Sequence, residues 1–369
     1  MKKFDKIPFE QIIAALLDND KPFPPIYLHR FSDLEPKQAK ALREAWPRVD
    51  AERRFNLIHD LDELASADTV VIFTETAEIA LDDADAKIRA AAIDLLSSLE
   101  DATHTKQLVQ LLTKDPSELV REHAAIALGF YMYLHEMEEI NPEVGAQIEK
   151  ALFDTFKSKE DANVRRRCME SLGYSSRKDM LIILEGAFHS SESQWIASAL
   201  FAMGRSGLER WNSHILEALE GDDPEIVLEA ARAAGELGIT EAVPMLTKMV
   251  EDENKPGEAV YYAAIWALSA IGGQEVRETL EKVGEKAAEE DDEELISFLE
   301  DALENLDFAE KLENGLDMLD LDLEEMVRSG RMIDLEAPLA DLEEEDEETP
   351  TDLPADNGHQ PAKKKGKKH

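Results

Sequence analysis

The stretches DPSELVREHAAIALG (residues 115–129) and DANVRRRCMESLG (residues 161–173) decide the fold of this chain. Each begins with aspartate, continues with an apolar residue followed by arginine, and ends in glycine. Aspartate favours a helix N-cap, and the apolar and small residues recur at helical spacing, which predicts an amphipathic helix. The same template returns at residues 85–92, 222–238 and 260–272, and less closely at 191–204 and 294–306.

The template returns at a nearly constant interval. Its central residue stands at Ala92, Ala124, Cys168, Ala199, Ala230, Ala264 and Leu299, with spacings of 32, 44, 31, 31, 34 and 35 residues. Such an interval holds two helices and two short turns. The partner helices are expected at residues 106–114, 147–157, 180–188, 212–219, 242–250 and 276–286. Because one hairpin cannot cover its own apolar face, we predict that the hairpins stack, with a glycine or small residue five positions after each centre allowing close approach.

The region before the first template copy also looks helical. Residues 35–65 read as another hairpin with its turn at Trp46-Pro47, and a helix at 69–81 completes the first clear unit. Residues 1–31 are a predicted capping segment with a helix near 8–18. Arrays of this kind need atypical ends to cover their terminal apolar faces.

The interval between Ala124 and Cys168 is longer than the others, and the composition changes after residue 306. The long interval comes from residues 130–140, which we expect to extend a helix by roughly three turns at ~3.6 residues per turn. We predict that the array spans residues 32–306 and that residues 307–369 are a disordered acidic tail. That tail contains an acidic segment with Leu and Met (316–327) and ends in a lysine cluster (363–368).

These features predict an all-α fold, a right-handed α-solenoid of about eight helical hairpins. The units resemble HEAT repeats, particularly the short HEAT-like repeats named for phycobilisome lyases, best at Val120-Arg121 to Gly129 and at Val164-Arg165 to Gly173. The chain also resembles bacterial HEAT-repeat proteins in its FSDL (31–34), AWP (45–47) and ALFAMGRS (199–206) segments. The resemblance implies the fold and does not by itself imply an activity.

Composition excludes several classes of protein. Forty basic and 81 acidic residues give a net charge of −41, which disfavours nucleic-acid binding by the body of the chain and binding to anionic membranes. The charge is uneven: residues 86–215 hold 15 basic and 19 acidic residues, whereas 216–307 hold 6 and 26. With one cysteine, no long apolar run and no secretory signal pattern, the chain is expected in the cytoplasm, with a structural thiol at Cys168.

Two enzyme-like alternatives come from the resemblance. Deoxyhypusine hydroxylase shares these repeats, and the resemblance would connect it to iron held by recurring His-Glu dipeptides. Here only His135-Glu136 forms one, outside the repeat frame, and Glu122-His123 is reversed, so we expect no metal site. A bilin-lyase-like chromophore chaperone is the second alternative, although nothing marks a pigment pocket. We expect no cofactor and no catalytic residues.

An arginine recurs just after the apolar residue that opens three second helices, at Arg89, Arg121 and Arg165. These arginines could line an anion groove. The structural alternative, which we favour, is that they bond the turn carboxylate of the same or the next repeat, as the resemblance to HEAT repeats implies.

The exposed side of the second helices is the candidate binding surface. Positions −1, +2 and +6 relative to each centre lie opposite the core at ~100° per residue. The columns read His123, Ile126, Phe130; Arg167, Glu170, Tyr174; Ser198, Phe201, Arg205; Glu229, Arg232, Glu236; and Ala263, Trp266, Ala270. Aromatic residues beside arginine are typical of interface hot spots. The candidate groove residues are Phe130, Arg167, Tyr174, Phe201, Arg205, Arg232 and Trp266, unless packing by the adjoining repeat buries them.

The sequence therefore favours a non-catalytic scaffold or adaptor that binds a protein or peptide on the concave face of the array. An adaptor whose acidic half covers a basic protein is a further hypothesis. Segment 316–327 could bind in the groove as a short helix, and the lysine cluster could bind an acidic neighbour or nucleic acid.

Overall fold

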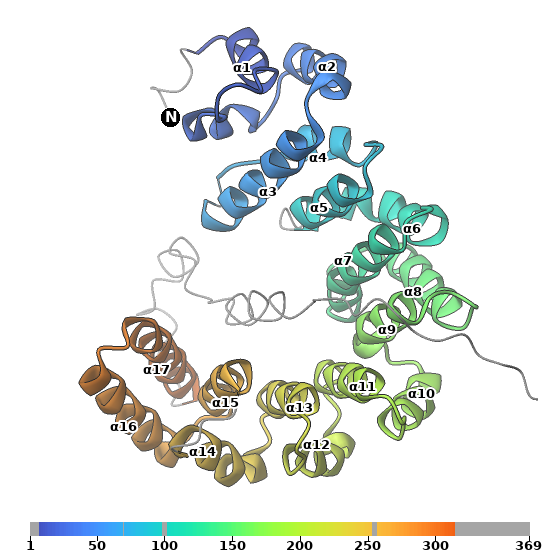
Figure 1. The fold of residues 1–369 in the computed structure, drawn as a ribbon. Helices are drawn as coiled ribbons and strands as arrows, with labels where there is room; N and C mark the ends of the chain where they lie inside the picture. The colour runs from blue at the N-terminus through green and yellow to red at the C-terminus, as the bar shows by residue number, and fades with distance from the viewer. Residues whose placement is uncertain (1–6, 69, 98–101, 253–256, 314–369) are drawn as a thin grey trace, which may run out of the picture. The chain divides into compact units, whose positions relative to one another are not determined.

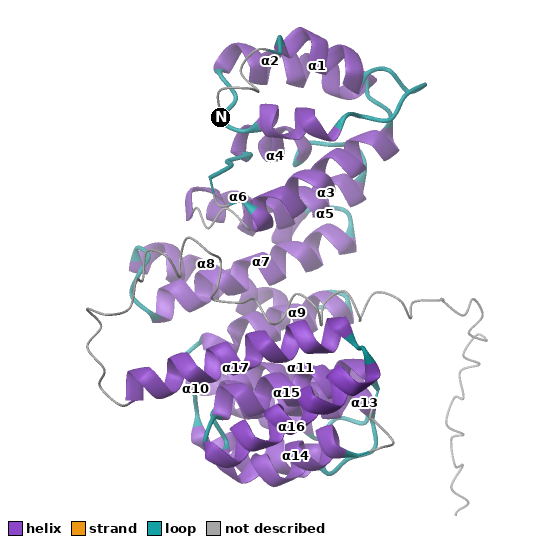
Figure 2. Cartoon of the chain, turned by 90° about the vertical axis from the view of Figure 1, so that its left-hand side faces the viewer, coloured by secondary structure: helices purple, strands orange, loops and turns teal. Residues whose placement is uncertain are grey.

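The computed structural model describes residues 7–68, 70–97, 102–252 and 257–313, and the side chains up to residue 308. Within these ranges the regular structure is entirely helical, with short loops between the helices and no strand (Figure 2). The predicted all-α class is confirmed.

Eight pairs of helices follow one another in the described ranges. The first helices are α2 (Pro36–Ala45), α4 (Thr74–Ala80), α6 (Thr105–Lys114), α8 (Pro142–Phe156), α10 (Lys178–Phe188), α12 (Asn212–Leu219), α14 (Val243–Glu251) and α16 (Gln274–Glu290). The second helices are α3 (Ala51–Ala67), α5 (Ala86–Ser97), α7 (Glu118–Glu136), α9 (Ala162–Ser171), α11 (Ser193–Arg205), α13 (Pro224–Glu236), α15 (Glu258–Ile271) and α17 (Glu293–Glu313). The number agrees with the predicted eight hairpins.

The second helices form one continuous layer. Each packs against the second helix before and after it, from α3 to α17, and consecutive members can be followed in Figure 1. From α4 onward, each first helix packs against the second helix of its own pair. Contacts between neighbouring units are what define an α-solenoid, as predicted.

The helices begin where the sequence supplies caps. The side chains of Asp50, Asp161 and Asp223 each accept a hydrogen bond from the backbone N–H two residues later, at 3.0, 2.8 and 3.1 Å. This bond satisfies one of the N–H groups that have no partner within the helix. The template aspartates Asp161 and Asp223 therefore act as the predicted N-caps of α9 and α13, and Asp50 caps α3 in the same way, whereas the N-cap of α7 is Ser117, which makes no side-chain cap hydrogen bond.

The predicted core positions are buried. The repeat centres Ala92, Ala124, Cys168, Ala199, Ala230 and Ala264 are all fully buried, as is Leu299. Burial raises the pKa of the Cys168 thiol, which keeps it protonated and unreactive. The structural role predicted for this cysteine is supported.

Glycines after the repeat centres bring second helices together. A Cβ atom on Gly173, Gly204 or Gly235 would lie 2.9 Å from the Cα of an alanine in the following second helix, at Ala202, Ala233 and Ala267. Real Cβ atoms do not approach that closely, so only glycine permits this spacing. The predicted role of the position five residues after the centre is confirmed.

Four boundaries differ from expectation. Helix α4 begins at Thr74 rather than 69, and α8 begins at Pro142 rather than 147, because Asn141 caps it. Helix α7 has 19 residues against 13 in α11, an extension of less than two turns rather than three. It ends because Glu138 adopts a left-handed backbone with φ 61°. Helix α17 continues to Glu313, past the predicted end of the array at 306.

The capping segment packs against α2 and α3, and one arginine of α3 bonds its backbone. It contains α1 (Phe9–Leu16) and the 3₁₀ helix η1 (Pro25–Phe31). Arg53 of α3 donates hydrogen bonds to the backbone carbonyls of Ala15 and Lys21, at 3.0 and 2.6 Å. Segment 316–327 and the lysine cluster 363–368 lie outside the described residues. No helix in the described ranges has the length and apolar content needed to cross a membrane.

Candidate functional site

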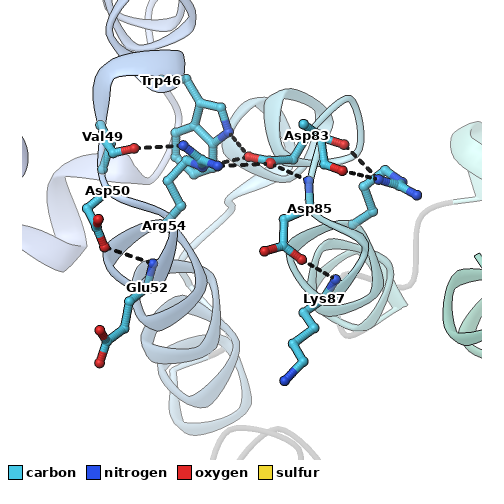
Figure 3. A network of polar contacts seen from close by, with 10 residues as sticks. Trp46, Val49, Asp50, Glu52, Arg54, Asp83, Asp85 and Lys87 are labelled. Atoms are coloured by element: carbon cyan, nitrogen blue, oxygen red, sulfur yellow. Dashed lines mark hydrogen bonds and ion pairs between the residues drawn. The ribbon is translucent and has the colours of Figure 1, made fainter.

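Arginines that recur on the second helices pair with carboxylates of the next repeat. We call the pairs Arg54–Asp83, Arg89–Asp115 and Arg121–Glu160 the arginine relay, and its first part is drawn in Figure 3. Arg54 lies against both carboxylate oxygens of Asp83, at 2.7 and 3.1 Å, and donates to the carbonyl of Val49 at 2.7 Å. Arg89 forms a bidentate pair with Asp115, at 3.0 and 2.8 Å. Each arginine thus joins a carbonyl near its own turn to a carboxylate in the next turn.

Asp83 is the centre of the first relay step (Figure 3). Its carboxylate also accepts hydrogen bonds from Trp46 Nε1 at 2.7 Å and from the backbone N–H of Asp85 at 2.9 Å. Its backbone carbonyl accepts from Arg89 at 2.8 Å. The side chain is only 2% exposed, so this buried charge depends on its donors for compensation.

The relay changes at α9. Arg121 still donates to Glu160 and to the carbonyl of Asp115, both at 2.8 Å. Arg165 instead donates to the carbonyl of Phe156 at 2.9 Å, with its guanidinium 5.6 Å from the Phe156 ring centroid and 5.4 Å from that of Trp195. The structural interpretation is confirmed for Arg89 and Arg121, whereas Arg165 pairs with no carboxylate among the described residues.

The candidate groove residues lie on the second-helix layer, and all seven are half-buried. Three of them come together. The Arg205 guanidinium lies 3.9 Å from the ring centroid of Phe201 and 5.3 Å from that of Tyr174. Tyr174 ends η4 (Leu172–Tyr174), which packs against both α7 and α11.

Tyr133 extends this group onto α7 and was missed by the sequence reasoning. Its ring centroid lies 5.4 Å from that of Tyr174, and the residue is 40% exposed. It lies in the helical extension, outside the repeat columns. The sequence does contain a signal for Tyr133, because the spacing of Ile126, Tyr133 and Met137 places large apolar residues on one side of α7. We call Tyr133, Tyr174, Phe201 and Arg205 the aromatic–arginine row.

The other groove residues contact different neighbours. Arg167 pairs with Glu170 at 3.1 Å, and Arg232 pairs with Glu229 at 2.9 Å. Trp266 lies against Gly235, where a Cβ atom would be 2.5 Å from its ring. Phe130 contacts the ring of Tyr131, at 5.5 Å between centroids.

Several residues expected on the exposed columns are buried. Ser198, Glu229 and Ala263 occupy position −1, and Glu170 occupies position +2. A neighbouring second helix covers this side of the helix, so the expectation that these residues are exposed was wrong. Ser198 Oγ donates to Glu170 and accepts from Arg166 at 3.1 Å, a buried polar network between α9 and α11.

Within the described residues, one group of side chains lies close enough together to bind a metal ion. It is an acidic cluster of Glu118, Glu122 and Asp161. A hydrogen bond to Asp161, with burial and nearby carboxylates, raises the pKa of Glu118 to about 6. Burial raises the pKa of Glu122, although Arg167 opposes the shift. Asp161 already caps α9.

Of the two dipeptides considered for iron, Glu122-His123 contributes only Glu122 to this cluster, and His135-Glu136 contributes neither residue. His135 is in the last turn of α7, and its ring packs so closely on Gly145 of α8 that a Cβ there would lie 2.1 Å away. His123 bonds Asp94 at 2.8 Å; burial lowers its pKa, but the Asp94 bond and charge outweigh burial and raise it. Both histidines therefore make contacts that hold neighbouring helices together.

Comparison with known proteins identifies the type of repeat in this chain. The family model for HEAT repeats matches residues 74–139 and 212–304. A HEAT repeat-containing taxis protein of Halobacterium salinarum is 29% identical over 163 residues, 44% of this chain and 34% of the relative. The matched part of the chain thus spans about a third of that relative's length.

Two solved structures are also similar. Human deoxyhypusine hydroxylase is 17% identical, covers 71% of this chain and 95% of its own, and has a TM-score of 0.31. Importin beta is 14% identical, covers 81% of this chain and 41% of its own, and has a TM-score of 0.37. Scores this low carry no functional argument. The stacked hairpins, the template residues and the family match together show that the chain contains HEAT repeats, at residues 74–139 and 212–304.

Proposed function

We propose that this protein is a non-catalytic scaffold that binds a protein or peptide on the second-helix layer between α7 and α11. The observation that carries the proposal is the aromatic–arginine row, in which Tyr133, Tyr174, Arg205 and Phe201 form a continuous series of ring contacts. The row joins three consecutive repeats, so a ligand bound to it would contact several units at once.

The chemistry of the row suits recognition. Tyrosine and arginine are enriched among the residues that dominate binding energies at interfaces. Rings held by neighbours lose little conformational freedom on binding, which favours affinity. The half-buried state of Tyr174, Phe201 and Arg205 supplies both rigidity and accessible surface.

Exposed apolar residues adjoin the row on α7. Ile126 and Met137 are 50% and 53% exposed, and they lie on the same side of the helix as Tyr133. Grouped exposed apolar side chains are typical of interaction surfaces. We therefore expect a ligand to cover this side of α7 together with the row.

Affinity capture with the full chain tests the proposal. The test variant is Tyr174→Ala with Phe201→Ala, and the control is Ile182→Ala, because Ile182 is 76% exposed on α10, in the other layer. Circular dichroism should show that all three proteins are folded. We expect partners recovered by the wild type and the control to fall at least roughly tenfold with the double variant. Equal recovery by all three would remove the assignment of this surface.

The same purified protein should be analysed for iron and for visible absorption. This measurement addresses the hydroxylase-like and lyase-like alternatives that the resemblance raises. A stoichiometric metal or a visible band would contradict a non-catalytic scaffold.

A further inference from the structure

We infer that the aromatic–arginine row recognises an acidic segment of a partner protein that carries large apolar side chains, with a carboxylate of that segment paired to Arg205. The inference rests on the proposed function and specifies the chemistry of the ligand. Its basis is the contrast between Arg205 and the other arginines of the second helices.

Arg205 has no carboxylate partner within the described part of the chain, although acidic residues outnumber basic ones by 81 to 40. Three arginines on other second helices, Arg53, Arg165 and Arg166, donate to backbone carbonyls or neutral side-chain oxygens of this chain. Five more pair with a carboxylate. They are Arg54 with Asp83, Arg89 with Asp115, Arg121 with Glu160, Arg167 with Glu170 and Arg232 with Glu229. The charge of Arg205 is therefore available to a ligand.

The two rings orient the Arg205 guanidinium. With centroids 3.9 and 5.3 Å away, Phe201 and Tyr174 restrict the plane of the group without using its N–H donors. Its Nε atom is buried and lacks a hydrogen-bond partner. A planar guanidinium held in this way matches the two oxygens of a carboxylate, which a bidentate pair requires.

The neighbouring surface requires apolar side chains in the same ligand. Tyr133 continues the row from Tyr174, and Ile126 and Met137 are half-exposed on the same side of α7. A carboxylate alone would leave this surface uncovered. A segment with Leu or Met beside Asp or Glu would satisfy both parts.

A basic peptide fits less well, because it would place a second cation against Arg205. An extended nucleic acid also carries anions, but the net charge of −41 would repel its successive phosphates. The same charge repels the other carboxylates of an acidic segment, so such a segment must gain its affinity from the Arg205 pair and from its apolar side chains.

Peptide binding to the full chain tests the inference by fluorescence anisotropy at 0.15 M NaCl. The probes are a labelled peptide LDMLDLDLEEMV, a neutral form with Asn and Gln replacing Asp and Glu, and a peptide of the same acidic composition in shuffled order. A single-stranded DNA 12-mer is the phosphate probe. The variants are Arg205→Gln and, as a matched control, Arg210→Gln, because Arg210 is exposed and stacks on Trp211 alone, at 4.7 Å.

We expect both acidic peptides to bind at least roughly tenfold more tightly than the neutral peptide. Arg205→Gln should remove that difference and leave binding of the neutral peptide unchanged, whereas Arg210→Gln should change neither. Circular dichroism checks that the variants are folded.

Four results would overturn the inference: no binding of the acidic peptides, equal binding of acidic and neutral forms, tighter binding of the DNA, or binding of LDMLDLDLEEMV but not of its shuffled form. The last result would make the chain's own segment 316–327 the ligand. The proposed function fails separately, if capture of partners does not depend on Tyr174 and Phe201.

Discussion

The repeats before α9 and those after it are joined by different interactions. Between α3 and α9, neighbouring repeats share buried arginine–carboxylate pairs, at Arg54–Asp83, Arg89–Asp115 and Arg121–Glu160. After α9 the arginine position holds Ile196 and Val227. There, Gly173, Gly204 and Gly235 allow second helices to pack backbone against backbone.

This difference shows that one repeat architecture can be stabilised in two ways. A buried ion pair is sensitive to the loss of one partner, because the other charge is then left uncompensated. A glycine contact is sensitive to added volume, because the opposing backbone cannot move away. Each region should therefore be sensitive to a different class of substitution, the first to the loss of a carboxylate and the second to added volume.

Removing a carboxylate should have the largest effect, in the first region. We expect Asp83→Ala to lower the free energy of unfolding by about 4 kcal/mol, since Arg54 and Trp46 lose their buried acceptor. Urea unfolding followed by circular dichroism measures the change. The control is Asp82→Ala, because the Asp82 side chain is 77% exposed and its ion pair with Arg43 is long, at 3.8 Å. We expect this substitution to cost less than about 1 kcal/mol. Equal losses in the two variants would show that the relay does not stabilise this region.

Adding one methyl group should have the next largest effect, in the second region. Gly204→Ala places a Cβ 2.9 Å from Ala233 Cα, and we expect it to cost about 2 kcal/mol. The matched control is Gly186→Ala in α10, where nothing lies within 4 Å of the new Cβ, so the better helix propensity of alanine should stabilise by up to about 1 kcal/mol. Thermal unfolding of both variants gives the comparison, and a neutral Gly204→Ala would contradict the close-approach explanation.

The smallest expected effect lies where the relay ends, at the contact between α7 and α9. Glu118 has its pKa raised from 4.5 to about 6, so its ionised form is less favourable in the folded protein than in the unfolded chain. That cost is present above pH 6 and disappears as the pH falls towards 4.5. We expect Glu118→Gln to raise stability by a few tenths of a kcal/mol at pH 8, after solvent screening, and to leave it unchanged at pH 4. Thermal unfolding at both pH values measures this difference; destabilisation at pH 8 would show that the ionised carboxylate is needed.

The layered helical fold could be predicted because its determinants are local and repeated. Aspartate caps such as Asp161, buried centres such as Cys168 and close-approach glycines such as Gly204 each occupy a fixed place in the repeat. The extension of α7 was overestimated because the left-handed residue is Glu138, a residue type that gives no turn signal.

The candidate surface was predictable only in part. Helical periodicity identified Tyr174, Phe201 and Arg205, because all three lie on the exposed side of their own helices. It could not show that Ser198 and Glu229 are buried. Ser198 bonds Arg166 and Glu170 of α9, about 30 positions away in the preceding repeat. Tyr133 was missed for the same reason, because it meets Tyr174 only after α7 and α9 stack.

The direction of the arginine relay has a consequence for synthesis of the chain. Each arginine is made before its carboxylate, Arg54 by 29 residues, Arg89 by 26 and Arg121 by 39. On the ribosome, the newest repeat therefore holds an uncompensated cation until the following turn emerges. Each turn completes the repeat made before it, so the first region gains its stability stepwise, in the order of translation.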